Sequence, residues 1–446
     1  MRKMLIYLFT FWGKWYIILV EENSMLIQFR FKNYKSFKNE AVLDLSSTKI
    51  TENADNVVQI GNEKVLKLAA IYGANASGKS GIFDAFQYMS YYVIQSFTFD
   101  DEISERQKEN RITPTPFRFS KETKDAPSEF EVYFSKIDKK GKVKFYNYGF
   151  SVDTNQVHEE WLNIKSASAR EYKNVFYRDL KEIEFPGLTS KQVELISEGL
   201  SDETLVLSLG AKLNVGIFKD IRRWFLDNET LNYASLSQNV YLYRNMPDDF
   251  DSDEQVQENV VKYFSSFDEG IVGFEVEENQ QTDEKEETTY TIDTLHKMMD
   301  SPDRGTIPLA DESAGTLKMF SLYPFLVSVI EKGNVLFIDE LNARLHPLLV
   351  RNIILLFANK ETNPNNAQLI FTTHDTWQLS TDVLRRDEVW FTEKDQIGCS
   401  SLYALSDFKD PNGVKIRKDE NYEKNYLLGN YGAIPRLTTL KLKGDK

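Results

Sequence analysis

Eight residues in the first fifth of the chain constrain its fold more than any other segment. An apolar run at residues 65–72 precedes them, and a segment with apolar residues at helical spacing follows. The eight are Gly73, Ala74, Asn75, Ala76, Ser77, Gly78, Lys79 and Ser80. Their spacing, G-x-x-x-x-G-K-S between a strand and a helix, is that of a phosphate-binding loop. The sequence therefore predicts an α/β fold in which a buried strand delivers this loop to the N-terminus of a helix.

The residue types of the loop suit a nucleoside triphosphate. Glycines let backbone N–H groups close around phosphates, and the helix N-terminus contributes its positive dipole. We expect the Lys79 ammonium to reach the β- and γ-phosphates and the Ser80 hydroxyl to ligate Mg²⁺. ATP with Mg²⁺ is thus the predicted ligand of residues 73–80.

A second apolar run ends in two carboxylates. Residues 335–338 are Val, Leu, Phe and Ile, and Asp339 and Glu340 follow them. In an α/β sheet, ligands bind outside the carboxyl ends of the strands, so this pair is expected beside the phosphate loop. We expect Asp339 to support Mg²⁺ and Glu340 to orient and activate the attacking water.

A histidine follows the next apolar strand along the chain. His374 comes directly after Thr373, one helix and one strand beyond Asp339. From that position an imidazole can hydrogen-bond the γ-phosphate or the lytic water. Glu340, His374 and Lys79 are therefore the predicted catalytic residues.

The hydrophobic pattern divides the chain into four parts. Residues 25–158 alternate as antiparallel strands do at 26–32, 41–45, 130–134 and 144–152, and this N-terminal lobe carries the phosphate loop. Residues 159–305 mix helix-like stretches at 190–199 and 214–228 with acidic segments, which indicates an inserted, partly helical subdomain. Residues 306–446 alternate helices with buried strands, which predicts a mainly parallel sheet covered on both faces.

The first 24 residues differ from the rest. Residues 4–20 are rich in aliphatic and aromatic side chains, yet they contain Lys14. They also fall short of the ~20 apolar residues that a membrane-spanning helix needs. Met25 opens the first strand-like stretch. We favour an extension from an upstream start site over a membrane anchor or an extension that packs on the body.

Charge and cysteine content narrow the class of protein. The formal net charge of −14 argues against a surface built to coat nucleic acid, although Lys212, Lys219, Arg222 and Arg223 form a local basic stretch. The single cysteine, Cys399, excludes an intramolecular disulfide and favours a reducing, cytoplasmic setting. Residues 159–305 lack sustained apolar heptads, so a long coiled-coil arm is not expected.

These motifs, in their order, resemble ATPase heads of the ABC and SMC type. The order is phosphate loop, Asp311-Glu312-Ser313-Ala314-Gly315-Thr316, Asp339-Glu340 and His374, and the resemblance covers nearly all of residues 25–446. Within that superfamily the chain is similar to the AAA-type ATPases of bacterial anti-phage and abortive-infection operons, the RloA and AbiL-like group. The segments that carry this similarity are FKNYKSF at 31–37, DEL at 339–341, LHP at 345–347, TTHD at 372–375, YLLG at 426–429 and YG at 431–432.

The resemblance implies a P-loop ATPase head with a mainly parallel core sheet, an N-terminal antiparallel sheet and an inserted subdomain. It also implies that Ser313, Gly315 and Thr316 contact the γ-phosphate of ATP held by a second copy. Two copies in a homodimer would then sandwich two nucleotides through one self-complementary surface. Thr316 stands where many such signatures carry Gln. In similar heads the basic residue of the first turn approaches the nucleotide, and here that residue is Lys35.

Two classes of function follow. In the first, ATP binding and hydrolysis gate an effector, a toxin or nuclease. We expect this effector to be a separate protein, because only about 70 residues follow His374 and they carry no clear set of nuclease carboxylates. In the second, the chain is a DNA-binding repair or chromosome-maintenance ATPase related to SMC heads, but the acidic balance and missing coiled coil count against DNA binding. A transporter subunit would need a membrane partner, which we do not expect. Nucleotide binding without hydrolysis is disfavoured, because the four residues that hydrolysis needs are all present: Lys79, Asp339, Glu340 and His374.

Overall fold

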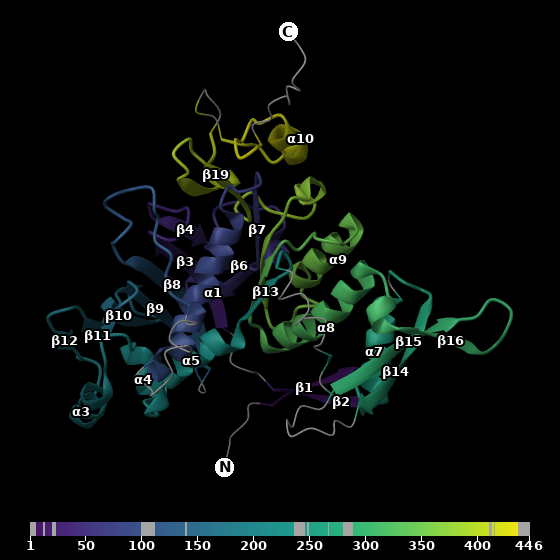
Figure 1. Cartoon of the computed structure of the whole chain (residues 1–446), viewed down its shortest axis with the longest axis horizontal. Coiled ribbons are helices and arrows are strands. Elements are labelled where there is room, and N and C mark those ends of the chain that lie inside the picture. The colour runs from purple at the N-terminus through teal and green to yellow at the C-terminus, as the bar shows by residue number, and fades with distance from the viewer. Residues whose placement is uncertain are drawn as a thin grey trace, which may run out of the picture.

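The protein is built around a six-stranded sheet that carries the phosphate loop at its centre. The computed structural model describes residues 6–11, 14–19, 24–99, 112–138, 141–235, 246–247, 249–265, 267–279, 289–409, 413 and 415–435. Figure 1 shows α1 and a second sheet on one side of this core sheet, and α8 and α9 on the other side.

The core sheet has the strand order β13-β17-β18-β7-β19-β20. Its first five strands are parallel, and only β20 runs antiparallel, against β19. This confirms the mainly parallel sheet expected from the sequence. The strands are β7 (Leu68–Gly73), β13 (Glu229–Asn232), β17 (Val335–Asp339), β18 (Gln368–Thr372), β19 (Val389–Lys394) and β20 (Ser400–Ala404).

Both faces of the core sheet are buried, which explains why its strands are continuous apolar runs in the sequence. In β7, Ala69 and Ile71 face the core that contains α1, whereas Leu68, Ala70 and Tyr72 face the core that contains α8 and α9. The three helices are α1 (Lys79–Gln95), α8 (Ala314–Lys332, with Pro324 inside it) and α9 (Pro347–Ala358).

The second sheet has seven antiparallel strands in the order β12-β11-β10-β9-β8-β3-β4. It continues across the expected boundary between residues 158 and 159, because β10 pairs with β9 along most of its length. The strands are β3 (Ser24–Lys32), β4 (Ala41–Asp44), β8 (Ser128–Ile137), β9 (Val143–Val152), β10 (Val157–Ser166), β11 (Lys173–Arg178) and β12 (Ile183–Glu184).

Helix α1 lies between the two sheets. The Phe86 ring is 5.3 Å from the Phe29 ring of the antiparallel sheet and 5.9 Å from the Phe337 ring of the core sheet. Trp224 extends this aromatic layer by stacking on Phe134 at 4.2 Å. It belongs to the last of three helices that lead from the antiparallel sheet to β13: α3 (Ser190–Gly199), α4 (Val206–Lys212) and α5 (Gly216–Asp227).

A smaller unit follows β13 and packs beside α8 (Figure 1). It consists of α7 (Glu254–Phe264) and a three-stranded sheet, β14 (Ile271–Asn279), β15 (Thr289–Lys297) and β16 (Arg304–Pro308). Phe250 and Phe274 contact Phe320 of α8, with ring centroids 5.4 and 5.8 Å away. Residues 280–288, in one acidic segment of the expected insertion, lie outside the described residues.

The remaining elements are short. The described residues of the N-terminal extension form an antiparallel pair, β1 (Ile6–Phe11) and β2 (Lys14–Leu19). Its assignment to an upstream start site stays a prediction. Within the part of the chain that the structure describes, no helix is long and apolar enough to cross a membrane. A hairpin of β5 (Val57–Ile60) and β6 (Glu63–Leu66) precedes β7, and 3-10 turns occur at Ala54–Asn56, Ser96–Thr98, Leu309–Asp311, Thr376–Gln378 and Leu405–Asp407.

The last described segment packs on the face of the core sheet that also carries α8 and α9. Tyr426, in α10 (Tyr422–Leu427), stacks on Phe391 of β19 at 5.3 Å, and Tyr431, after this helix, lies 5.9 Å from the same ring. The tyrosines of the YLLG and YG segments therefore pack against β19, near the strand end that leads from β7 into the phosphate loop.

Candidate nucleotide-binding site

The phosphate loop leaves the end of β7 and enters α1 through a turn that requires glycine. Gly78 has φ +118°, in the left-handed region that side chains rarely adopt, and a Cβ there would lie 2.6 Å from Ser400 Oγ. Ala76 also has a positive φ, of 62°. The loop therefore depends on two residues in the left-handed conformation, and a side chain at position 78 would disrupt it.

The Lys79 side chain folds back over its own loop. Its Nζ donates hydrogen bonds to the carbonyls of Gly73 (2.9 Å) and Ala74 (3.1 Å), and the residue is buried. Burial lowers the pKa of Lys79 to about 8, while the nearby Glu340 and Asp339 act in the opposite direction. A buried ammonium held by loop carbonyls is well suited to exchange them for phosphate oxygens.

Hydroxyl groups from the neighbouring strands hold the loop. Ser77 Oγ lies 2.5 Å from Thr392 Oγ1 on β19, and Ser400 Oγ donates to the Ser77 carbonyl at 2.6 Å. Ser400 also lies 2.8 Å from the hydroxyl of Ser36, in the turn after β3. Sequence reasoning missed Thr392 and Ser400, because the pairing of β19 with β7 and of β20 with β19 brings them to the loop.

Asp339 is the last residue of β17 and is fully buried. Thr372 Oγ1 donates to one of its carboxylate oxygens at 2.6 Å and accepts from the Glu340 backbone N–H at 2.8 Å. The other oxygen, Oδ2, has no hydrogen-bond partner among the described residues. A buried carboxylate oxygen is costly to leave unpaired, so it is an available acceptor or metal ligand.

The residues present fit Mg²⁺. The ion prefers hard oxygen ligands such as carboxylates, hydroxyls and phosphates. Asp339 supplies an unpaired carboxylate oxygen, and Ser80 follows Lys79 in the first turn of α1. These two residues would hold the ion, and the bound ion would neutralise charge on the phosphates.

Glu340 and His374 meet at the same edge of the sheet. Glu340 Oε1 lies 4.0 Å from His374 Nε2, and each side chain is 35% exposed. Burial lowers the pKa of His374, and the Lys79 charge lowers it further. Both effects favour the neutral imidazole, in which one nitrogen donates a hydrogen bond and the other accepts one, whereas the charges of Glu340 and Asp339 act in the opposite direction.

Asn342 holds the backbone of this histidine. Its Oδ1 accepts from Thr373 Oγ1 at 2.9 Å and from the His374 backbone N–H at 3.2 Å. The contact joins the segment after β17 to the segment after β18. Sequence reasoning missed Asn342 and Thr372, since a polar residue near a strand end carries no role until the strand order is known.

The expected signature segment begins α8. Ser313 is the N-cap, and its Oγ accepts from the Thr316 backbone N–H at 3.1 Å. Thr316 is buried, and a Cβ on Gly315 would lie 3.2 Å from the Arg344 carbonyl. The single chain thus shows these residues as a helix cap, and their contact with ATP of a second copy stays a prediction.

The predicted approach of Lys35 to the nucleotide is likewise untested. Its Nζ pairs with the carboxylate of Asp84 on α1, and its backbone N–H donates to Thr115 at 2.6 Å. Binding of Lys35 to a nucleotide would require this ion pair to open.

The local basic stretch is engaged within the protein. Lys212 and Arg222 lie over the Phe97 ring, at 5.0 and 5.1 Å from its centroid. Arg223 pairs with Asp227 at 3.5 Å, and Lys219 Nζ donates to a side-chain oxygen at 3.3 Å. Lys212, Lys219 and Arg223 nevertheless stay exposed to solvent, so these contacts do not remove the basic surface.

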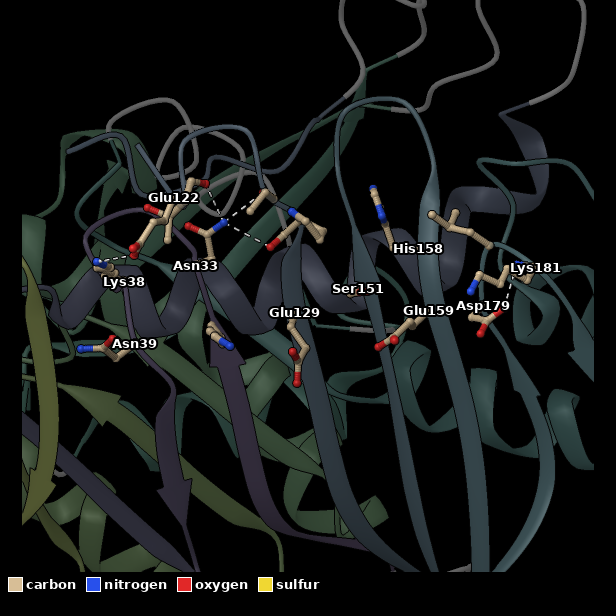
Figure 2. Close-up of a pocket in the computed structure, with 15 residues that line it drawn as sticks. Asn33, Lys38, Asn39, Glu122, Glu129, Ser151, His158, Glu159, Asp179 and Lys181 are labelled. Carbon is tan, nitrogen blue, oxygen red and sulfur yellow. Dashed lines mark hydrogen bonds and ion pairs between the residues drawn. The ribbon is translucent and has the colours of Figure 1, made fainter. Parts of the chain in front are cut away.

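A cavity of about 700 Å³ lies elsewhere, on the antiparallel sheet (Figure 2). Its lining includes Lys32, Glu129, Ser151 and Glu159, which are cross-strand neighbours on β3, β8, β9 and β10. None of the predicted site residues lines it. The cavity is therefore separate from the candidate nucleotide site.

Comparison with known proteins identifies a family for the chain. Residues 68–376 match the family model described as "AAA domain, putative AbiEii toxin, Type IV TA system". The crystal structure of the SmcHead bound to the C-winged helix domain of ScpA is similar at a TM-score of 0.42 and 13% identity, covering 85% of this chain and 97% of that one. No significant match was found among curated proteins.

Proposed function

Because this chain belongs to the family of AbiEii-type AAA domains, we propose that it binds ATP with Mg²⁺ and hydrolyses it to ADP and phosphate. One observation carries the proposal. The buried, unpaired Oδ2 of Asp339 and the buried ammonium of Lys79 belong to one electrostatically coupled group at the end of the core sheet. A buried carboxylate oxygen and a buried cation that bonds to its own loop are both satisfied by a bound metal–phosphate group.

The residues divide the reaction between them. The loop amides and Lys79 would hold the phosphates, and Lys79 would oppose the negative charge that spreads over the γ-phosphate oxygens in the transition state. Glu340 would orient the attacking water and accept its proton. His374 would hydrogen-bond the γ-phosphate or the same water.

We further propose that two copies form the complete site. Ser313 and Gly315 start a 19-residue helix, so their free backbone N–H groups and the helix dipole favour an anion placed at that end. In a homodimer that anion would be the γ-phosphate of ATP held by the other copy. Thr316 would contribute by holding Ser313, to which it is hydrogen-bonded, rather than by direct contact.

Phosphate release from purified protein tests the ATPase directly. We expect turnover with Mg²⁺ and ATP, and loss of turnover when EDTA removes the ion. Lys79→Ala should lose nucleotide binding, whereas Lys418→Ala, which changes an exposed lysine far along the chain, should behave as the wild type. Wild-type protein that binds ATP but never releases phosphate would refute hydrolysis and leave a binding module.

We also propose that the ATPase acts in the cytoplasm and gates a separate effector, a toxin or nuclease, in anti-phage defence. The family description names a toxin of a toxin–antitoxin system, and the described residues contain no group of three or more His, Cys, Asp or Glu side chains placed to hold a metal ion. The acidic balance disfavours DNA as the main partner.

Affinity capture from the native host tests the effector. Tagged Glu340→Gln protein with ATP and Mg²⁺ should recover a stoichiometric nuclease or toxin-like protein by mass spectrometry. Wild-type protein in EDTA is the matched control for state-dependent binding. Recovery of the ATPase alone on tightly bound DNA would instead support the repair or chromosome-maintenance function.

A further inference from the structure

A buried lysine outside the predicted site contacts the turn that carries Glu340. Lys318 lies on α8, five residues after Ser313, and is 1% exposed. Its Nζ donates to the backbone carbonyls of Glu340 (3.2 Å), Leu341 (2.7 Å) and Ala343 (2.9 Å). All three partners lie within one short turn after β17.

That turn has an unusual backbone. Glu340 has φ 57° and Arg344 has φ 62°, so two residues with side chains adopt the left-handed conformation within five positions. Each such residue is strained by about 1 kcal/mol or more, and surrounding contacts must hold it there. The carbonyls of this turn converge on Lys318, so the lysine is one of those contacts.

The contacts of Lys318 suit an ammonium group, although burial opposes its charge. The Lys318 ammonium lies 4.1 Å from the centroid of the Tyr233 ring, whose face attracts positive charge. Burial lowers the pKa of Lys318 to about 7, while the Glu340 charge acts in the opposite direction. An ammonium has three donors, which match three carbonyls; a glutamine amide has two donors and a methionine has none.

The first turn of α8 also contacts the last residue of the segment 340–344. A Cβ on Gly315 would lie 3.2 Å from the Arg344 carbonyl, so the glycine permits a close approach of the two backbones. The segment from Ser313 to Lys318 therefore contacts the Glu340 turn at both ends.

We propose that Lys318 is a positioning residue that fixes the turn after β17, so that the Glu340 carboxylate lies beside His374 in the geometry that hydrolysis needs. This inference rests on the proposed ATPase function. It also makes the start of α8 and the Glu340 turn one mechanical unit. A change at Ser313 and Gly315, which would face the nucleotide of the second copy, is then passed to Glu340 of the same chain.

Lys318→Met and Lys318→Gln test the proposal in the full-length protein. Misplacing a catalytic group by about 1 Å can cost about 100-fold in rate. We therefore expect kcat to fall roughly 10- to 100-fold in Lys318→Met and by a smaller factor in Lys318→Gln. Because Lys318 contacts neither the phosphate loop nor Asp339, the Kd for Mg-ATP should stay within about threefold. Lys332→Met, which removes an exposed lysine from the same helix, should change neither value.

A double mutant separates positioning from general destabilisation. In the Glu340→Gln background the lysine has no carboxylate left to position, so adding Lys318→Met should lower the residual rate less than about twofold. If the lysine only supports the fold, the two losses should instead multiply. Hydrogen exchange gives a readout without turnover: amides of residues 340–345 should exchange roughly tenfold faster in Lys318→Met.

The outcomes are distinct. Wild-type turnover together with unchanged kcat in Lys318→Met and Lys318→Gln would overturn the positioning role and leave the ATPase proposal standing. Absence of turnover in the wild type would overturn the ATPase proposal, and the positioning role with it. Should Lys318→Met fail to fold, a Lys318→Gln variant that binds ATP and shows wild-type kcat also overturns the inference.

Discussion

The two ends of the core sheet both bury charged side chains, but they use them differently. At the carboxyl ends of the strands, Lys79 bonds to its own loop and Asp339 leaves one oxygen unpaired. At the amino ends, buried charges and amides bond to distant parts of the chain. Arg385 pairs with Asp387 at 2.9 Å, and Lys67 donates to the Ala358 carbonyl at 2.6 Å.

The amino end joins segments that are far apart in sequence. Arg385 also bonds to the carbonyls of Glu52 and Ile50, and the Gln368 side chain bonds to both backbone groups of Leu26. Burial raises the pKa of Glu388 to about 8, which favours its neutral form; one oxygen accepts from Asn56, and the other has no hydrogen-bond partner among the described residues. These contacts tie the first strands to the core sheet and contribute to stability.

The difference between the two ends indicates which buried charged side chains stabilise the fold and which take part in nucleotide chemistry. A buried charge whose hydrogen bonds are completed within the protein stabilises the fold, and its loss leaves partners unpaired. A buried charge with an open position is destabilising until a ligand arrives. Substitutions at the two ends should therefore separate stability from nucleotide chemistry.

The largest effect is expected at the amino end. Arg385→Met should lower the free energy of unfolding by about 3–5 kcal/mol, because it leaves Asp387 as a buried, unpaired charge. Chemical denaturation measures this loss, and Arg351→Met, at a partly exposed arginine stacked on Trp377, is the control. The Kd for ATP of the folded fraction should not change; a parallel loss of ATP affinity would mean that the two ends are not separable.

Lys79→Ala should show the reverse behaviour. Removing a charged donor to phosphate should weaken ATP binding about 100-fold, equivalent to about 2.7 kcal/mol. Stability without nucleotide should be unchanged or higher, because the variant no longer buries this ammonium. Calorimetric titration and thermal melts of the same samples make the comparison. A strongly destabilised Lys79→Ala protein would contradict the assignment.

Asn342→Ala should have a smaller, purely kinetic effect. The amide oxygen holds the backbone N–H of His374 and the hydroxyl of Thr373, so its loss should loosen the histidine. We expect kcat to fall about tenfold with ATP affinity nearly unchanged. Asn359→Ala, at the end of α9, is a matched control. Equal losses in kcat and in affinity would instead place Asn342 in nucleotide binding.

The smallest predicted effect is a pH dependence of ATP affinity. The pKa of Lys79 in the free protein is about 8, well below its ordinary value, and bound phosphates raise it. Raising the pH from 7.5 to 9 therefore deprotonates the free protein but not the complex, so ATP binding should weaken roughly eightfold. In Lys79→Arg the affinity should be lower but independent of pH in this range, because arginine does not titrate there. Affinity that rises with pH would contradict the sign.

The core elements could be predicted because they obey local rules. The strands before Gly73 and Asp339 are buried on both faces, so they are apolar runs, and Pro347 marks the start of α9. The P-loop ATPase fold followed from the loop spacing and motif order, whereas the similarity to the RloA and AbiL-like group stays a prediction. The continuation of the antiparallel sheet beyond residue 158 was not predicted. Apolar and polar residues alternate only weakly in β10 and β11, and many polar residues surround these strands.

The contacts around the site could not be predicted from sequence. Thr372 reaches Asp339, and Ser400 reaches Ser77, only because of the order in which the strands pair. Lys318 did leave a signal: it shares a helical face with Leu322, Leu326 and Val329, all buried. A lysine on an apolar face must be paired, but its partners depend on the tertiary structure.

The most direct test of the account compares Glu340→Gln with wild-type protein at saturating Mg-ATP. Phosphate release and the bound nucleotide after rapid desalting are measured on the same preparation, with Glu361→Gln, an exposed glutamate, as the matched control. We predict at least ~100-fold slower turnover in Glu340→Gln, with ATP rather than ADP retained and the homodimer trapped. Turnover equal to that of the wild type would contradict the assignment of Glu340 and, with it, the proposed mechanism.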